Sequence, residues 1–506
     1  MRRPLALALA SSLVAGLGIV AASAAPAAAP AAPQRGTITW HACDKDLDLT
    51  GFECGTLTVP RDWDNLANPL NASIKLAIYR STARNRIGAL TFNPGGPGES
   101  GLASASAIRS VLPSSVRNRF DFVAWDPRGV GLSEPQLDNC IAPRQEPYNP
   151  PATGPIDWAL LAKETYDAMA QGQAACLAAN PDVAPYLGTY YVIRDLEAMR
   201  IALGERQWNI WGMSYGTRIG YRYAREYPTR VRTLVLDGAW SPNLTVRGWM
   251  NGETWNFLSG QTVFSSLFGK KMGFRLQKVI DGLDERTITV DGTELTRWQV
   301  LPAIFTNISY QTAFPTILDV ITAAYKALYE KDQSAARRLP GLLRQLKERA
   351  EPNPNAAVNI TFINCRDMAG YPTVDEIVRA TEVSAANSTL MGGVTAIGKG
   401  AFCAGLPADF TYGYTPLVDN LTLPTPPVVI NSLGDTRTEY IFGRTMANSM
   451  AGSSLITYDS TQHVSYRQVP SRCISDAVTN YLLTQRQPGN LLCPYAPIPS
   501  APPASP

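Results

Sequence analysis

The sequence contains very little histidine: only two of its 506 residues are His, at positions 41 and 463. Protein sites for transition metals are commonly built from several imidazole groups, so we expect no histidine-rich metal centre and no bound metal. We also expect no organic cofactor. Any step that needs an imidazole must use one of these two side chains.

Charged side chains are also scarce, at 17% of the chain, and the formal net charge is only +3. Lys and Arg do not cluster into runs, so the sequence lacks the basic surface that would indicate nucleic acid as a partner. Hydrophobic residues make up 45% of the chain, and its length allows a large buried core. These values exclude a disordered protein.

The N-terminus has the pattern of a secretory signal peptide. Met1-Arg2-Arg3-Pro4 is followed by an Ala/Leu/Val-rich run and by Ala22-Ser23-Ala24, a small-residue cleavage site. An uncleaved anchor is the alternative, because the apolar run is nearly long enough to span a bilayer, but its Ala, Gly and Ser content favours cleavage. We therefore predict a signal peptide over 1–24, a spacer or propeptide over 25–35, and a secreted, extracellular protein without stable membrane association.

The cysteines form no Cys-x-x-Cys motif, and an even number in an exported chain favours disulfides over a metal site. Eight cysteines allow about 105 pairings, and the sequence does not choose among them. The simplest prediction joins neighbours along the chain: Cys43 with Cys54, Cys140 with Cys176, Cys365 with Cys403, and Cys473 with Cys493.

Short apolar segments alternate with segments of helical spacing through the first half of the chain. Such alternation favours an α/β protein with a mainly parallel sheet covered by helices on both faces. The predicted strands are 72–79, 88–93, 120–125, 207–211 and 231–237, and the predicted helices between them are 158–179 and 192–203.

The alternation stops after the last of these strands and returns only at 427–433. The interval 240–423 has mostly helical character and is predicted to be a large insertion, a cap, at the C-terminal edge of the sheet. The core then consists of 36–239 and 424–493, followed by a Pro/Ala/Ser-rich tail, 494–506, that we expect to be loose.

Residues 212–216 read Gly-Met-Ser-Tyr-Gly and lie between an apolar strand and a helix that starts near Tyr215. In this context G-x-S-x-G is the sharp strand-to-helix turn that exposes a serine hydroxyl at the top of an α/β-hydrolase sheet. Without that context the motif arises often by chance. We therefore predict Ser214 as the nucleophile of a hydrolase with the α/β-hydrolase fold.

A serine hydroxyl needs a base within hydrogen-bond reach, and histidine is the usual one. His463 follows the last predicted strand and fits the chain order Ser, acid, His, whereas His41 precedes the sheet and is interpreted as structural. The acid should end the penultimate strand, where Asp435 lies. Asp459 and Glu439 are the alternatives, although both suit a solvated loop.

The segment Asn93-Pro-Gly-Gly-Pro-Gly98 follows a buried strand, where such a hydrolase carries one side of its oxyanion hole. Its glycines allow backbone N–H groups to approach a substrate oxygen. We predict the N–H of Gly96, with Gly95 as the alternative, together with the N–H of Tyr215. A tight Pro/Gly turn without a catalytic role is the competing interpretation.

Several separate motifs follow one another in a specific order. They are Asn93-Pro-Gly-Gly-Pro-Gly98, Asp126-Pro-Arg-Gly-Val-Gly131, Asp195 with Leu203-Gly204, Trp211-Gly-Met-Ser-Tyr-Gly-Thr217, Leu236-Asp-Gly238, Ile363-Asn-Cys-Arg-Asp367 and the late Asp/His pair. Together they resemble the tripeptidyl aminopeptidase-like, prolyl-aminopeptidase-related branch of secreted actinobacterial α/β-hydrolases, over most of the mature chain. The resemblance implies a cap over the cleft and release of short peptides, tripeptides in particular, from an unblocked N-terminus.

Two positions depart from the pattern of that family. The acid is commonly followed by Thr-Pro, where this chain has Thr438-Glu439. The histidine usually lies among glycines, where this chain has Gln462-His463-Val464. The rim of the site is therefore expected to differ from that of the relatives.

The resemblance implies that the ammonium group of the substrate must be bound, for which a carboxylate in the insertion is suited. Asp367 and Glu253 are the candidates, although acids in exposed helices are more often solvated. The expected partner is a peptide or acyl substrate, and a monomer is favoured, with the oligomeric state left open. Three other functions remain: an ester or thioester hydrolase, a peptidase that processes a secreted precursor, and a binding protein without catalysis.

Overall fold

The computed structural model describes residues 36–498 except 139, 141–149, 351–353 and 415–419. The predicted signal peptide, 1–24, and the predicted spacer, 25–35, lie outside the described residues, as does the end of the tail. Among the helices that are described, none combines the length and the apolar character needed to cross a membrane.

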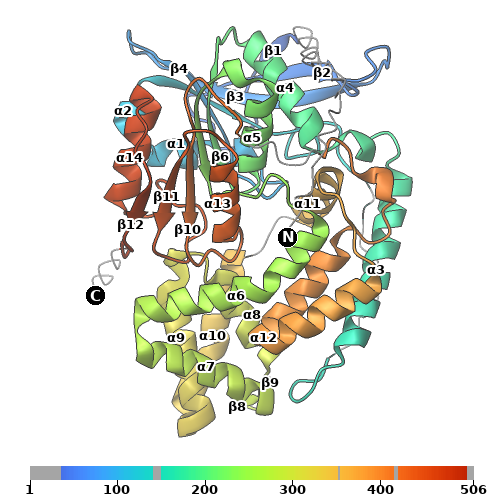
Figure 1. Ribbon diagram of the computed structural model, residues 1–506, viewed down its shortest axis with the longest axis vertical. Helices are drawn as coiled ribbons and strands as arrows, with labels where there is room; N and C mark the ends of the chain where they lie inside the picture. The colour runs from blue at the N-terminus through green and yellow to red at the C-terminus, as the bar shows by residue number, and fades with distance from the viewer. Residues whose placement is uncertain (1–35, 139, 141–149, 351–353, 415–419, 499–506) are drawn as a thin grey trace, which may run out of the picture.

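A ten-stranded sheet forms the centre of the molecule (Figure 1). The strands β4, β5, β6, β7, β10, β11 and β12 pair with one another in parallel, whereas β1, β2 and β3 at one edge pair antiparallel, with β3 joined antiparallel to β5. In spatial order the strands are β1 (Ile38–His41), β2 (Glu53–Pro60), β3 (Asn71–Tyr79), β5 (Phe120–Trp125), β4 (Gly88–Asn93), β6 (Trp208–Met213), β7 (Val231–Asp237), β10 (Val428–Ser432), β11 (Ser454–Tyr458) and β12 (Leu491–Cys493).

Every residue of β4, β5 and β6 is buried, because helices cover both faces of the sheet. Apolar side chains of α1 (Gly101–Val111) and α14 (Arg472–Thr484) pack on one face, close to the short helix α2 (Ser114–Arg117). The other face is covered by α4 (Thr189–Ala202), α5 (Gly216–Glu226) and α13 (Tyr440–Asn448). The predicted α/β architecture is confirmed.

The chain between β7 and β10 is mainly helical, and Figure 1 shows most of these helices gathered beyond one end of the sheet. Much of this cap has a hydrophobic core of its own, which includes Phe264, Ile304 and Ile321. Its elements are α6 (Val246–Phe268), α7 (Lys270–Glu285), the hairpin β8 (Ile288–Val290) and β9 (Thr293–Leu295), α8 (Arg297–Asn307), α9 (Phe314–Tyr325), α10 (Gln333–Ala350), α11 (Pro354–Asp367) and α12 (Val374–Gly400).

Helix α3 (Trp158–Ala179) was predicted as part of the sheet-covering core, but it lies alongside the cap helix α12 (Figure 1). Its Ala162 belongs to the same apolar cluster as Met250 and Ile377 of the cap. Helical spacing in the sequence indicates an apolar face without indicating the surface on which that face packs.

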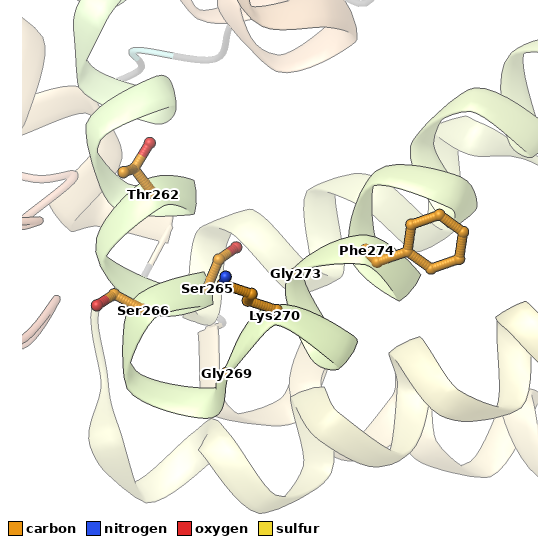
Figure 2. Close-up of a pocket in the computed structure, with 7 residues that line it drawn as sticks. All are labelled: Thr262, Ser265, Ser266, Gly269, Lys270, Gly273 and Phe274. Atoms are coloured by element: carbon orange, nitrogen blue, oxygen red, sulfur yellow. The ribbon is translucent and has the colours of Figure 1, made fainter.

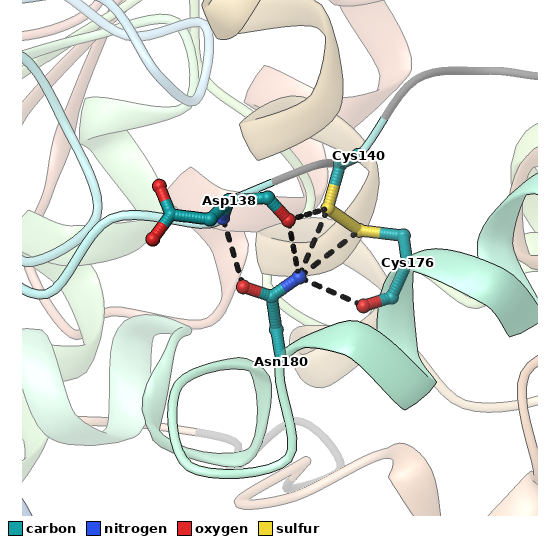
Figure 3. Close-up of a disulfide and its surroundings, with 4 residues drawn as sticks. All are labelled: Asp138, Cys140, Cys176 and Asn180. Atoms are coloured by element: carbon teal, nitrogen blue, oxygen red, sulfur yellow. Dashed lines mark hydrogen bonds between the residues drawn. A yellow bond between two sulfur atoms is a disulfide. The ribbon is translucent and has the colours of Figure 1, made fainter.

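All four predicted disulfides are present: Cys43–Cys54, Cys140–Cys176, Cys365–Cys403 and Cys473–Cys493. Figure 3 shows how Asn180 supports the second of them. Its side-chain amide donates to the carbonyl oxygens of Asp138 at 2.8 Å and Cys176 at 2.9 Å, and its Oδ1 accepts from the Asp138 N–H at 2.8 Å. Disulfides of this number are typical of proteins outside the cytoplasm.

The first residues of the predicted loose tail are held against the cap. The ring of Tyr495 lies 6.4 Å from that of Phe314, and the Ala496 carbonyl accepts a hydrogen bond from the Gln311 side chain at 3.0 Å. The Ala496 N–H donates to the Tyr458 hydroxyl at 3.1 Å. The prediction of a loose tail from residue 494 onward was therefore wrong for these positions, where the chain joins core to cap.

Candidate active site

Ser214 occupies the turn between β6 and α5, with a φ of +53° that L-residues seldom adopt. Its N–H donates to the carbonyl of Asp237, the last residue of β7, at 2.9 Å. The turn is possible only because Gly216 lacks a side chain: a Cβ there would lie 2.5 Å from the Asn93 carbonyl oxygen. The predicted strand–serine–helix turn is therefore present, and backbone strain of this kind clusters at functional sites.

The glycine-rich loop that follows β4 lies directly against this turn. A Cβ on Gly95 would be 2.8 Å from Ser214 Cβ and 3.3 Å from the Tyr215 nitrogen. The Gly95 N–H already donates to Asn93 Oδ1 at 3.1 Å. Because that donor is occupied, the geometry favours the N–H of Gly96 over that of Gly95 as the partner of the Tyr215 N–H in an oxyanion hole.

Asp435 and His463 form a buried pair, 2% and 8% exposed. His463 Nδ1 lies 2.8 Å from Asp435 Oδ2. The other carboxylate oxygen accepts the N–H groups of Arg437 at 2.8 Å and Thr438 at 3.1 Å. An acid at Nδ1 directs the opposite ring nitrogen, Nε2, to the reacting side of the imidazole.

The two alternative acids, Asp459 and Glu439, do not lie beside His463 as Asp435 does. Asp459 is exposed. Glu439 is directed at the cap helix α6, since its Oε1 lies 2.6 Å from the position that a Cβ on Gly252 would take. Of the three acids considered, Asp435 is the one in contact with His463. His41 lies on the exposed edge strand β1, remote in the fold from this pair.

Thr438 was not predicted as a site residue, although its position was noted as a departure from the family pattern. Its hydroxyl donates to Asp435 Oδ2 at 2.9 Å and lies 3.2 Å from His463 Nδ1. The hydroxyl therefore helps to orient the carboxylate toward the imidazole. The Thr that commonly follows the acid in the family was the available signal.

The turn between α8 and α9 brings the cap into contact with the two loops that carry Asp435 and His463. The Ser309 carbonyl accepts the His463 N–H at 2.8 Å, and the Ser309 hydroxyl lies 2.6 Å from that of Thr436. The Gln311 N–H donates to the side chain of Gln462 at 2.8 Å. No local pattern marks these residues as site residues, because their partners lie far away along the chain.

The α6 helix adds a further contact to the loop that carries Asp435. The Asn256 side-chain amide donates to the Thr436 carbonyl at 2.8 Å, and the Ser259 hydroxyl donates to the Leu433 carbonyl at 3.2 Å. The cap therefore holds the acid loop from two of its elements.

Comparison with known proteins shows the family to which this chain belongs. The profile described as "alpha/beta hydrolase fold" matches residues 88–276, and the one described as "TAP-like protein" matches 388–493. Serine protease Hip1 of Mycobacterium tuberculosis is 30% identical over 466 residues, covering 86% of this chain and 85% of that protein. The chain belongs to the TAP-like α/β-hydrolase family. It is a serine hydrolase.

Two further relatives of this TAP-like hydrolase differ in the extent of the match. Tripeptidyl aminopeptidase of Streptomyces lividans is 37% identical over 231 residues, which cover 44% of this chain and 42% of that protein. Carboxylesterase B of M. tuberculosis is 27% identical over 534 residues, covering 95% of this chain and 96% of the relative.

The structure describes the surroundings of only one of the two acids that were predicted to bind a substrate amine. Asp367 is only 7% exposed, and its Oδ1 accepts the Thr189 N–H at 2.8 Å while its Oδ2 accepts the Tyr215 hydroxyl at 3.0 Å. These contacts occupy the carboxylate and argue against an ammonium-binding role for Asp367. Glu253 lies in α6, but its side chain lies outside the described residues.

Asp367 instead links the cap to the serine turn. The Thr189 hydroxyl, from α4, donates to its Oδ2 at 2.5 Å and lies 2.7 Å from the Tyr215 hydroxyl. Burial, together with the nearby Asp367 carboxylate, raises the pKa of Tyr215 well above its usual value. The phenol therefore stays protonated and acts as a donor.

A groove of about 560 Å³ lies elsewhere, between the end of α6 and the start of α7 (Figure 2). None of the proposed catalytic residues lines it. Its lining residues are Thr262, Ser265, Ser266, Gly269, Lys270, Gly273 and Phe274.

Proposed function

We propose that this TAP-like hydrolase is a secreted serine exopeptidase that releases short peptides, tripeptides in particular, from unblocked N-termini. The observation that carries the proposal is the buried Asp435–His463 contact of 2.8 Å, on a scaffold whose serine turn lies against a glycine-rich loop. The names of two relatives, serine protease and tripeptidyl aminopeptidase, support a peptide substrate.

The proposed reaction starts with attack of Ser214 Oγ on the scissile carbonyl, while His463 Nε2 accepts the hydroxyl proton. The resulting oxyanion is stabilised by the N–H groups of Gly96 and Tyr215, each of which is worth about 10²–10³ in rate in comparable hydrolases. His463 then gives the proton to the leaving amine, and the C–N bond breaks. Water, deprotonated by His463, hydrolyses the acyl-enzyme and releases the peptide and the free Ser214 hydroxyl.

An exopeptidase of this kind must hold the ammonium group of its substrate at a fixed distance from the serine. Since the contacts of Asp367 occupy its carboxylate, we propose Glu253 of α6 for this role. The neighbouring residue of α6, Gly252, lies against Glu439, which immediately follows Thr438 in the chain. This segment of α6 is therefore adjacent to the loop that carries Asp435.

The test uses three substrates that share one leaving group: a free-amino tripeptide anilide, its N-acetylated twin, and an acyl anilide without an amine. We expect turnover of the first at least tenfold faster than of the others, since an ammonium bound by a carboxylate contributes about 1.5–3 kcal/mol. Ser214→Ala and His463→Ala should abolish turnover. Retained turnover in both variants overturns the proposed mechanism, and equal rates on the first two substrates overturn the aminopeptidase assignment.

An ester hydrolase is the second candidate, because Carboxylesterase B matches nearly the whole chain. The same catalytic residues cleave esters and amides, so the fold does not decide between them. Comparison of kcat/KM on a p-nitrophenyl acyl ester with that on the free-amino tripeptide anilide distinguishes the two functions. Glu253→Gln should lower kcat/KM only for the peptide, with the exposed acid Glu348→Gln as the matched control.

A further inference from the structure

Asp237 lies at the end of β7, between the two strands whose ends lead to Ser214 and Asp435. It is fully buried, with 0% of its surface exposed. The next residue, Gly238, lies against the proposed base, since a Cβ there would be 3.1 Å from His463 Cε1. The end of β7 is therefore the common neighbour of the serine turn and the histidine loop.

The side chain and backbone of Asp237 contact both of these segments. Its carbonyl accepts the Ser214 N–H at 2.9 Å. Its Oδ1 accepts the Ser465 N–H at 2.9 Å, and its Oδ2 accepts the Tyr466 N–H at 2.7 Å. Both carboxylate oxygens thus bind the backbone just after His463, and hydrogen bonds that involve a charged acceptor are the stronger kind.

The loop that they hold is strained. Val464, between His463 and Ser465, has a φ of +57°. A β-branched residue rarely adopts this left-handed conformation, and such a conformation persists only where the surroundings impose it. The side chain of Gln462 donates to the carbonyl oxygens of His463 at 2.7 Å and Val464 at 3.1 Å, which restrains the same turn from the other side.

We propose that Asp237 is a positioning residue for His463: its carboxylate fixes the left-handed turn at Val464 and thereby sets the orientation of the imidazole relative to Ser214. The inference rests on the proposed catalytic roles of Ser214 and His463. Asp237 does not contact substrate. It acts through the loop, so its loss misplaces the base without altering substrate binding.

The first test is Asp237→Asn, which keeps the size of the side chain but replaces one acceptor oxygen by a donor. We expect kcat to fall about 100-fold, the size of effect that a misplacement near 1 Å produces, while KM changes less than about twofold. The rate of Ser214 labelling by an organophosphonate should fall in parallel. A kcat within about threefold of the parent value, or an effect confined to KM, overturns the inference.

Asp121→Asn is the matched control, because Asp121 is also a buried carboxylate with hydrogen-bonded partners, Ser81, Arg80 and Arg86. It lies near the start of β5, away from the catalytic loops. Its substitution should lower the thermal stability but leave kcat per labelled active site unchanged. A matching loss of kcat in this control would show that destabilisation alone accounts for the Asp237 effect, which overturns the inference.

Rescue provides the second test. Gly adopts positive φ readily, so Val464→Gly should let the turn keep its left-handed conformation without the hydrogen bonds of the Asp237 carboxylate. We expect Asp237→Asn/Val464→Gly to recover at least about tenfold in kcat over Asp237→Asn, with a smaller Asp237 effect in the Val464→Gly background. If Asp237→Asn alone does not fold, kcat of the double variant is compared with kcat of Val464→Gly. A kcat that is still about 100-fold lower in the double variant contradicts the proposal that Asp237 acts by fixing the turn at Val464.

Failure of this inference and failure of the proposed function give different results. If Ser214→Ala and His463→Ala retain turnover, the proposed mechanism is wrong whatever Asp237 does. If both lose turnover while Asp237→Asn retains it, only the positioning role of Asp237 is wrong.

Discussion

The sheet core and the cap contribute to the site in different ways. The core presents Ser214, Asp435 and His463 on loops at the ends of β6, β10 and β11. The cap supplies none of these three residues, yet its Ser309 contacts both the acid loop and the histidine loop, and its Asp367 binds Tyr215 beside the serine. The core therefore carries the groups that we propose to react, and the cap restrains the loops that hold them.

The cap itself is divided. The end of α6 and the helices α7 to α10 share a separate hydrophobic core, whereas Phe362, Ile363 and Met368, in or just after α11, pack into the main core of the sheet. Helix α11 is thus an extension of the core, although it belongs to the inserted segment of the chain. We expect substitutions in α11 to affect the stability of the whole protein, and substitutions at the α8–α9 turn to affect mainly catalysis.

The largest expected effect tests the core side of this comparison. Asp435→Asn removes the charge beside His463 Nδ1 and favours the wrong imidazole tautomer, so kcat should fall about 10⁴-fold with little change in KM. Steady-state kinetics and a thermal melt measure both quantities. A loss below about tenfold would show that another acid serves His463.

Asp367→Ala tests whether α11 behaves as part of the core. It leaves the hydroxyls of Thr189 and Tyr215 without their acceptor and Arg218, 3.9 Å away, without its buried counter-charge. We expect a loss of about 3 kcal/mol in the free energy of unfolding, measured by denaturant titration. An unchanged stability with a raised KM would instead restore the substrate-amine role for Asp367.

The pH dependence of stability tests the buried end of β7. Burial raises the pKa of Asp237 from 3.8 to about 6, although the hydrogen bonds from the Ser465 and Tyr466 N–H groups lower it in part. The stabilisation associated with its protonation is complete below pH 3.8 and is lost as the pH rises through about 6, a difference of about 3 kcal/mol. The unfolding free energy of the parent protein should therefore rise relative to that of Asp237→Asn as the pH falls from 7 to 4. A constant difference contradicts this.

Thr438→Val tests a smaller element of the core. It removes the hydroxyl that donates to Asp435 Oδ2 but keeps the branched shape, so kcat should fall about tenfold with KM nearly unchanged. Thr438→Ser, which restores the donor, should recover most of the loss. Equal losses in both variants would indicate a packing role for Thr438.

The smallest expected effect lies on the cap side. Ser309→Ala removes the contact with Thr436 but retains the carbonyl that accepts the His463 N–H, so kcat should fall only about threefold. Thr262→Ala, in the groove of Figure 2, is the matched control on the cap and should leave kcat unchanged. An equal effect of the two substitutions would remove the distinction between the α8–α9 turn and the rest of the cap.

Prediction from sequence succeeded where structure depends on neighbours in the chain. The strands β4, β5 and β7 were predicted with the bounds that the structure shows, because each is a short, mainly apolar segment. The edge strands β1 and β12, and β2 beside β1, were not predicted, since their exposed residues interrupt that pattern. The residues proposed as nucleophile, acid and base were found from the serine motif, the scarcity of histidine and the order of strands.

The contacts between core and cap could not be predicted in the same way. Thr461, beside the proposed base, donates to the Ile308 carbonyl 153 positions earlier in the chain. Nothing in the local sequence of either residue identifies the other, because a backbone carbonyl carries no side-chain signature. The role of the α8–α9 turn therefore depends on how the whole insertion packs.

The sequence by itself identified the residues that we propose as nucleophile, acid and base, because residue type and order along the chain point to them. It offered the neighbour-to-neighbour cysteine pairing only as the simplest of many, and the structure selected it. Only the tertiary structure decided that Asp367 binds Tyr215, that α3 lies with the cap and that Asp237 and Ser309 hold the histidine loop. A buried polar group needs a hydrogen-bond partner, and only the packing of the whole chain decides which group comes within reach.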